Sequence, residues 1–434
     1  MKKAGFVLLF FLFAPPCFAD FALYMYMGDS LRSGAGKNST ANNAAVTFTN
    51  PGALVDLPTH STMIEGQYFD SRMGFHDTGS TDVIGNPLTG GDGGNGGESQ
   101  FVPGFYLANK LNDRWSYGLA LNVPFGLSVN WPDDWKGRYQ VTKTGIETIN
   151  INPAVAYRIN PQVSVGFGIS AQYANAELAN AIDFGAVCFS QLDPTTCSGL
   201  GMTPQAADGK VTVKGNDWGY GYNFGFYITA SAKTRVGVSY RSKIDYKLEG
   251  TADFTIPTQA TVFNPAFTDT HVSVPLTLPE MVSAGLTHAF TPQFLLSADA
   301  TWTRWSRLQS FEFTFENPAQ PALSIERNWK DAWRYALGAE YVKNSKWTYQ
   351  GGIAFTQSAI PNETLDPAIP ISDAWSFSGG FIYAVSTTMH IGAGFTHLEF
   401  ANRSTNHTSP YGDTLRGELR PKLDIYSLQA KWVY

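Results

Sequence analysis

The chain is short of charge, of cysteine and of long apolar runs. Only 15% of its 434 residues are Asp, Glu, Lys or Arg, against roughly 25% in an ordinary soluble domain. The formal net charge is −6, so the chain lacks the basic excess that binds nucleic acid. Beyond the first 19 residues, no apolar run reaches the about 20 residues of a membrane-spanning helix. These absences exclude a nucleic-acid-binding protein and a helical membrane protein.

The chain is rich in aromatic residues and glycine, and its apolar residues alternate with small or polar ones. Aromatics make up 14% of the residues, and there are 42 glycines. In 163–173, for example, Val165, Phe167 and Ile169 alternate with Gly166 and Gly168. A period of two indicates strands whose two faces lie in different environments. Low charge, many aromatics and period-two segments are typical of a transmembrane β-barrel.

About fourteen such segments follow one another along the chain. They lie near 61–72, 101–109, 115–124, 146–158, 163–175, 218–230, 235–248, 280–290, 294–303, 332–343, 347–356, 375–385, 389–399 and 424–434. The connections alternate between tight turns and long loops, which predicts turns on the periplasmic side and loops outside the cell. An even number of strands places both chain ends in the periplasm. We therefore predict an all-β fold, an antiparallel barrel over 59–434 in the outer membrane.

The N-terminus has the pattern of a secretory signal peptide over 1–19. A basic start is followed by an apolar stretch and a small-residue exit, with cleavage expected between Ala19 and Asp20. A lipoprotein anchored at Cys17 is the weaker alternative, because the residues before it make a poor lipobox.

Export leads to an oxidising compartment, where Cys188 and Cys197 share one polar stretch. We expect them to form a loop disulfide. A metal pair would need nearby histidines, and a redox pair usually has C-x-x-C spacing.

Residues 20–58 fall outside the strand pattern. They are rich in Gly, Asn, Ala and Ser, and a barrel of about fourteen strands is too wide for its own side chains to fill. We predict that 20–58 folds back into the lumen as a plug, or hatch. A disordered periplasmic tail is the alternative.

Several motifs follow one another along the mature chain: Asn50-Pro51-Gly52 in the predicted plug, 124–127 (PFGL), 135–139 (WKGRY), 148–153 (TININP), 240–243 (YRSK), 278–280 (LPE), 302–306 (WTRWS) and 329–334 (WKDAWR). In this order they resemble the motifs of the FadL/TodX family of outer-membrane transporters for long-chain fatty acids and other hydrophobic compounds. The family usually has Ala where this chain has Gly52. The last residue is Tyr434, where many outer-membrane barrels end in Phe.

The resemblance implies passive transport through a plugged barrel. A hydrophobic ligand is captured at the extracellular loops, passes to an interior pocket, and leaves sideways at a kinked strand. By this likeness Phe125 and Gly126 mark the kink, where Pro124 and Gly126 would interrupt strand pairing. A simple strand end entering a loop is the alternative reading.

Two long loops, 176–217 and 249–279, are more apolar than solvated loops should be, which usually marks a binding surface. The resemblance makes them the capture groove. Its candidate residues are Phe184, Val187, Phe189, Leu192, Phe254, Val262 and Phe263. The alternative is that these side chains only pack the loops on each other.

A fatty acid would need a cation to orient its carboxylate. The candidates near the barrel mouth are Arg138, Arg327, Lys330 and Arg334. Each could instead pair with Asp133, Glu326 or Asp331, or contact lipopolysaccharide. Asn180, where a cationic pocket residue would be expected, leaves a neutral hydrocarbon open as cargo.

No histidine stands in a G-x-S-x-G or H-E-x-x-H context, so we expect no enzyme, cofactor or metal. The expected partners are a hydrophobic small molecule, outer-membrane lipid and lipopolysaccharide, around a monomer. The alternative functions are a general diffusion porin for small solutes and a channel for neutral aromatic or aliphatic hydrocarbons.

Overall fold

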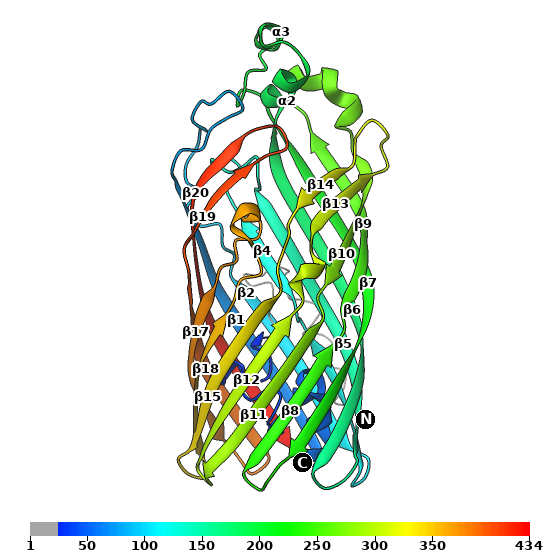
Figure 1. Cartoon of the computed structure of the whole chain (residues 1–434), viewed down its shortest axis with the longest axis vertical. Coiled ribbons are helices and arrows are strands. Elements are labelled where there is room, and N and C mark those ends of the chain that lie inside the picture. Colours follow the sequence, from blue (N-terminus) through cyan, green and yellow to red (C-terminus); the bar gives the residue numbers. More distant parts are fainter. Residues whose placement is uncertain (1–24) are drawn as a thin grey trace.

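The structure, a computed structural model, describes residues 25–434. The expected signal peptide and the first residues of the expected plug lie outside that range. Twenty strand segments form one antiparallel sheet, and the sheet closes because the first strand pairs with the last along most of its length. The result is a tall barrel (Figure 1).

Six of the crossings are interrupted, so the segments join end to end into fourteen crossings, as the alternation predicts. The strands are β1 (His60–Asp77), β2 (Gln100–Lys110), β3 (Trp115–Asn122), β4 (Gly126–Asn130), β5 (Lys143–Arg158), β6 (Val163–Asp183), β7 (Asp208–Thr229), β8 (Thr234–Arg241), β9 (Ile244–Thr255), β10 (Thr270–Leu278), β11 (Met281–Thr291), β12 (Phe294–Thr303), β13 (Ser310–Phe315), β14 (Leu323–Glu326), β15 (Ala332–Val342), β16 (Trp347–Thr356), β17 (Ala374–Ala384), β18 (Met389–Phe400), β19 (Arg403–Thr408) and β20 (Thr414–Val433). The interrupted crossings are β3–β4, β8–β9, β10–β11, β12–β13, β14–β15 and β18–β19.

The period of two sorts the side chains between the outside of the barrel and its interior. Along β20, Tyr426 and Leu428 are exposed whereas Ile425 and Ser427 are buried. Exposed aromatics recur on the outer face, as at Trp218 and Tyr220 of β7. Apolar and aromatic side chains that face outward are the surface that lipid requires.

The two ends of the barrel differ. The connections at one end are short, such as 159–162 and 343–346, and the C-terminus lies at that end (Figure 1). The other end carries the long loops with helices α2 (Phe184–Gln191) and α3 (Pro194–Gly199), and the 3-10 turn η4 (Thr258–Ala266). Among residues 25–434, no helix is long and apolar enough to cross a membrane.

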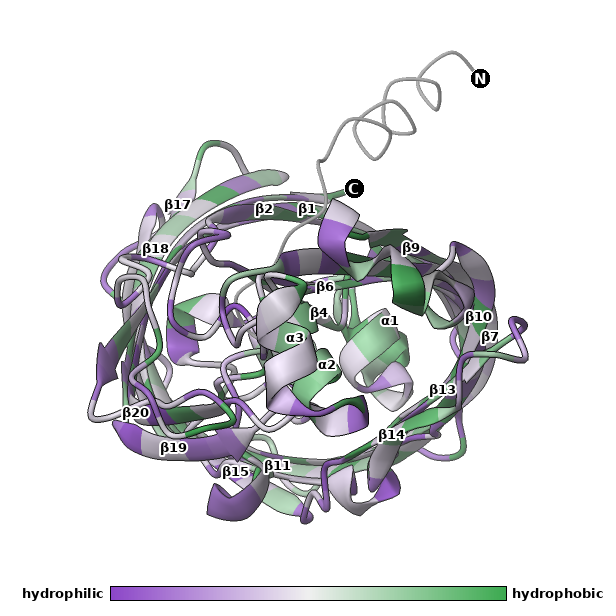
Figure 2. Cartoon of the chain, turned by 90° about the horizontal axis from the view of Figure 1, so that it is seen from above, coloured by the Kyte–Doolittle hydropathy of each residue, from purple (hydrophilic) through white to green (hydrophobic). Residues whose placement is uncertain are grey.

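Residues 25–57 lie inside the barrel and are almost entirely buried. They contain the short turns η2 (Ser30–Arg32), α1 (Val46–Thr49) and η3 (Pro51–Asp56). Asn50 caps η3, because its side chain accepts a hydrogen bond from the Gly52 amide, and Pro51 supplies a preset φ at the first position of η3. Seen from above, α1 lies within the ring of strands (Figure 2).

Candidate functional site

The plug is hydrogen-bonded to strands all around the barrel. The Asn50 side-chain amide donates to the carbonyls of Asn38 and Phe226, at 2.7 and 3.0 Å. On other sides of the lumen, the Asp299 carboxylate accepts from the Asn38 side chain at 2.7 Å, and Lys431 donates to the Asn42 carbonyl at 2.8 Å. Because these partners come from β7, β12 and β20, the wall holds the plug from several directions.

Glycines on the inner wall let the plug backbone approach closely. A Cβ at Gly237 would lie 1.7 Å from the Asn38 carbonyl oxygen, and one at Gly352 would lie 2.3 Å from that of Arg32. The same reasoning applies within the plug motif. A Cβ at Gly52 would lie 2.8 Å from the Gly225 carbonyl oxygen, so this wall accepts Gly52 without the shift that Ala would require.

The barrel wall is interrupted between β2 and the crossing formed by β3 and β4. The β2–β3 ladder ends at the pair Phe105–Leu121, and β4 pairs with β5. One isolated bridge, Gly97–Val129, joins the two edges again nearer the loops. We call the stretch between these two pairings the wall break.

The backbone around Phe125 and Gly126 is held from β5 and not from β2. The Thr148 hydroxyl accepts from the Phe125 amide and donates to the Phe125 carbonyl, at 3.0 and 2.8 Å, and Gly126 is paired with Glu147. Pro103 and Pro124, on opposite edges of the wall break, carry no N–H. Neither proline can therefore donate a backbone hydrogen bond across the wall break, and a lateral exit at Phe125 and Gly126 stays a prediction.

Two cavities lie above the plug, toward the loops. The outer one has a volume of about 620 Å³ and is lined by polar and apolar residues, among them Tyr139, Phe254, Phe267 and Asp413. The inner one has a volume of about 100 Å³. Its lining is mostly apolar and includes Leu127, Leu276 and Phe313, but it also contains Glu177, Lys214 and Arg327. We call them the vestibule and the inner cavity.

Of the candidate cations, only Arg327 lines the vestibule and the inner cavity. Its guanidinium pairs with Asp366, and both side chains are buried. Its Nε is buried without a hydrogen-bond partner among the described residues. Arg327 therefore holds one unpaired donor, covered by neighbouring side chains, where the two cavities adjoin.

The other candidate cations have different surroundings. Arg138 donates to Asp208 at 2.8 Å and to the Tyr139 hydroxyl at 2.7 Å. Arg334 is buried beside the plug, where it donates to the Ser33 carbonyl at 2.6 Å. Lys330 is exposed.

The apolar residues of the two long loops form a small core rather than an open surface. Phe184, Val187 and Phe263 are buried in it, whereas Leu192 and Val262 are 41% and 62% exposed. Phe189 and Phe254 pack against the core, and of the seven capture candidates only Phe254 lines the vestibule. The structure thus shows the loops packed on each other, and a capture role for these residues stays a prediction.

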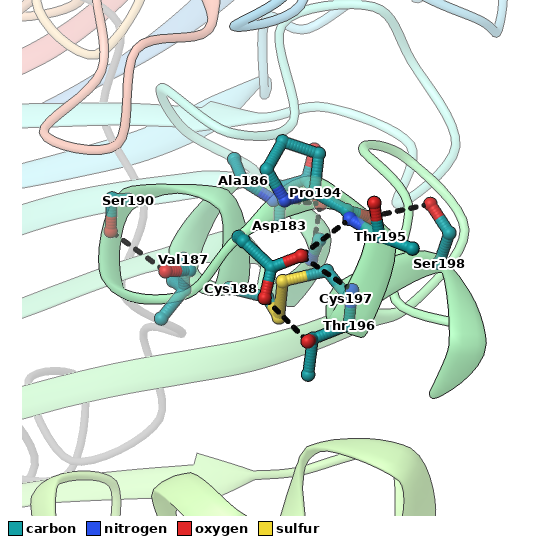
Figure 3. Close-up of a disulfide and its surroundings, with 12 residues drawn as sticks. Asp183, Ala186, Val187, Cys188, Ser190, Pro194, Thr195, Thr196, Cys197 and Ser198 are labelled. Atoms are coloured by element: carbon teal, nitrogen blue, oxygen red, sulfur yellow. Dashed lines mark hydrogen bonds between the residues drawn. A yellow bond between two sulfur atoms is a disulfide. The ribbon is translucent and has the colours of Figure 1, made fainter.

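The predicted disulfide is present and joins α2 to α3 (Figure 3). Each helix begins at an aspartate cap, with the Asp183 carboxylate accepting from the Gly185 and Ala186 amides and Asp193 doing the same for α3. Caps and a cross-link stabilise helices too short to be stable alone.

Sequence reasoning missed several polar residues of the interior, above all Asp299 and Asp366. A charged residue on the lumen face of a strand, as at Asp299, was an available signal. Asp366 lies in a loop, and its pairing with Arg327 has no local signature. Among residues 25–434, no cluster of three His, Cys, Asp or Glu side chains could hold a metal ion.

Comparison with known proteins agrees with this architecture. Residues 28–434 match the family model described as outer membrane protein transport protein (OMPP1/FadL/TodX). The long-chain fatty acid transport protein of Salmonella typhi is 28% identical over 405 residues, covering 91% of this chain and 90% of that protein.

Two crystal structures show the same fold. A Pseudomonas aeruginosa FadL homologue has a TM-score of 0.87 at 24% identity, covering 95% of this chain and 99% of that one. The Ralstonia pickettii toluene transporter TbuX has a TM-score of 0.68 at 18% identity, covering 96% and 99%. The chain belongs to the outer membrane protein transport family (OMPP1/FadL/TodX), and its barrel lies in the bacterial outer membrane.

Proposed function

We propose that this barrel carries hydrophobic molecules with a carboxylate head, such as long-chain fatty acids, passively across the outer membrane. The observation that carries the proposal is Arg327, a buried cation with an unpaired Nε at the junction of the vestibule and the inner cavity. An entering carboxylate displaces the side chains that cover Nε and accepts from it. The alkyl chain enters the mostly apolar inner cavity, where each buried CH₂ contributes about 0.8 kcal/mol. The relative from Salmonella typhi carries the name of a long-chain fatty acid transporter.

The proposed route has three stations. The vestibule receives the ligand beside Phe254, and the inner cavity holds its chain beside Leu127 and Phe313. The ligand then leaves into the membrane through the wall break at Phe125 and Gly126. Its movement follows the concentration gradient, and the protein acts as a transporter and not as an enzyme. The proposed transporter is a monomer, and lipid and lipopolysaccharide surround its barrel.

A general diffusion porin needs an open lumen, whereas residues 25–57 occupy this one. A channel for neutral hydrocarbons is the second candidate. It is favoured by the acidic residues that line the vestibule, among them Asp183, Glu363 and Asp413, and by the pairing of Arg327 with Asp366. TbuX, which has this fold, is titled a toluene transporter.

Equilibrium binding of dodecanoate and of dodecanol separates the two candidates, because the ligands share a chain and differ in charge. Removing the charged pair with Arg327→Met/Asp366→Leu should weaken dodecanoate binding about 10- to 100-fold and leave dodecanol binding within about twofold. Lys330→Met, at an exposed cation nearby, is the control and should change neither. Equal loss for both ligands, or no loss for dodecanoate, would contradict the carboxylate assignment.

A further inference from the structure

On the plug side of the inner cavity lies a cluster of three buried aromatic rings contributed by three separate parts of the chain. Trp305 contacts Phe125 edge-to-face, with ring centroids 6.2 Å apart and an interplanar angle of 87°. Trp305 also contacts Trp329, with centroids 5.2 Å apart. We call Phe125, Trp305 and Trp329 the aromatic cluster.

The cluster crosses the lumen. Phe125 belongs to the third crossing, at the wall break, whereas Trp305 lies between β12 and β13 in the ninth. In a closed barrel of fourteen crossings these positions are nearly opposite. Contact between their rings therefore spans the interior above the plug.

Trp305 reaches inward because its strand is broken there. The 3-10 turn η5 (Trp305–Arg307) separates β12 from β13. Glu280, in the neighbouring crossing, holds this turn. Its carboxylate accepts from Arg304 at 3.0 Å and from Arg307 at 2.8 Å, and its carbonyl accepts from the Arg304 amide at 3.0 Å. Glu280 is thus a positioning residue for the Trp305 ring.

Each part of the chain that supplies a ring also supplies a wall of the inner cavity, a few residues nearer the loops. Leu127 follows Phe125, Phe311 follows Trp305, and Arg327 precedes Trp329. Below the cluster, Trp305 and Trp329 line a separate small cavity together with Met25 of the plug. The aromatic cluster therefore lies between the inner cavity and the plug. Its Phe125 ring lies at the plug-side part of the wall break, whereas Leu127 lies at the part beside the inner cavity.

We infer that the aromatic cluster is an internal gate, and that a ligand in the inner cavity reaches the plug-side part of the wall break, at Phe125 and Gly126, only when the Trp305 ring moves away from Phe125. This inference rests on the proposed function. An edge-to-face contact between two buried rings is strong enough to hold a closed state and weak enough to be displaced by an entering alkyl chain. The same geometry selects hydrophobic ligands, because only an apolar molecule can replace the contact between the Trp305 and Phe125 rings with contacts of its own.

The test separates binding from transfer. Protein reconstituted in lipid vesicles is loaded with fluorescently labelled dodecanoate, and its equilibrium affinity and its rate of release into the bilayer are both measured. Trp305→Ala should release the ligand about two- to tenfold faster and keep the equilibrium affinity within about twofold. Glu280→Gln, which weakens the anchor of η5, should act in the same direction with a smaller effect.

Trp375→Ala is the matched control, because Trp375 is 47% exposed on the outer face of β17, and it should leave both quantities unchanged. If Trp305→Ala does not fold, Trp305→Phe keeps a ring, shortens its reach, and should still speed release. Release at the wild-type rate or slower, with binding intact, overturns the gate. Failure of the wild-type protein to bind dodecanoate or dodecanol would instead overturn the proposed function.

Discussion

Arg327 and Asp366 form an ion pair in which both side chains are about 95% buried, at the junction of the two cavities above the plug. Burial raises the pKa of the Asp366 carboxyl, but Arg327 and backbone amides outweigh this effect and the net pKa is below its usual value. The pair joins the loop that precedes β15 to the loop that contains the 3-10 turn η6 (Asn362–Thr364). The ion pair therefore holds these two loops together over the lumen. It also keeps Arg327 beside the vestibule and the inner cavity.

Asp366→Ala should loosen these loops without unfolding the barrel. Removing one partner of a buried pair leaves an uncompensated charge, at a cost of about 3–5 kcal/mol. We expect faster hydrogen exchange in 357–373 and unchanged exchange in β16 and β17. Asp366→Ala combined with Arg327→Met should recover part of the protection, and a double variant as exposed as the single one would show that the pair does not hold the loop.

Asn50→Ala should loosen the plug. The side chain makes two hydrogen bonds to backbone carbonyls and accepts one from Gly52, and their loss leaves buried groups unsatisfied, at about 1–3 kcal/mol each. We expect a higher frequency of ion-conducting events in planar bilayers. Gln162→Ala, in an exposed turn at the short-turn end, is the control. Equal conductance in the two variants would exclude Asn50 as an anchor.

Gly237→Ala should displace the plug more strongly than an alanine elsewhere in the wall. The added Cβ would lie 1.7 Å from the Asn38 carbonyl oxygen, whereas a Cβ at Gly379 meets nothing within 4 Å. We therefore expect raised conductance and increased protease cleavage within 25–57 for Gly237→Ala, but not for Gly379→Ala. Wild-type behaviour of Gly237→Ala would mean that the plug backbone does not rest on β8.

Replacing both cysteines by serine should act locally. The disulfide closes a short loop, with a separation of nine residues, so its removal costs about 2–3 kcal/mol of loop stability in the chain-entropy account. The hydrogen-exchange rate should rise in α2 and α3 and stay unchanged in residues 163–174 of β6. Loss of the whole barrel on reduction would contradict this local role.

The vestibule should loosen as pH rises. Burial, with Asp183 nearby, raises the pKa of Asp413 to about 7, and its Oδ1 is buried without a partner among the described residues. Because the folded pKa exceeds the unfolded one, Asp413 favours the folded loop fully below about pH 4, and the benefit is lost as pH rises to about 7. Hydrogen-exchange protection of 405–414, corrected for intrinsic rates, should fall about tenfold or more between pH 5 and pH 8.

Asp413→Asn isolates this effect, since the amide does not ionise. It should flatten the pH dependence of protection in 405–414. Asp193→Asn, at an exposed helix cap in the same group of loops, should leave the dependence in place. An unchanged slope in Asp413→Asn would assign the effect to another group.

The barrel could be predicted from the sequence because lipid imposes a repeating pattern on every crossing. Runs such as 163–173 show the alternation of apolar with small or polar residues, and this alternation does not depend on which strands they pair with. The breaks within the crossings have no comparable sequence pattern. The turn η5 depends on Glu280 in another strand accepting from Arg304 and Arg307, a contact that exists only after the strands are side by side.

The sequence predicts the class of site, an apolar cavity with a cation, but not which residues line it. Apolar composition drew attention to Phe184, Phe254 and Phe263, yet composition cannot distinguish a side chain that packs a loop from one that lines a cavity. The sequence does not rank Arg327 above the other three candidate cations. Which of them reaches the interior depends on the path of its loop. Trp305 was part of a motif with no role attached to it.

The glycines of the inner wall have a consequence for exchanging parts between relatives. Gly225, Gly237 and Gly352 each lie where a side chain would collide with the plug. The inner wall is therefore sterically complementary to one backbone path of the plug. A hatch grafted from a homologue would follow its own path and meet this wall at the wrong places. Chimeras should therefore succeed only when hatch and inner-wall glycines are transplanted together, as a single inherited unit.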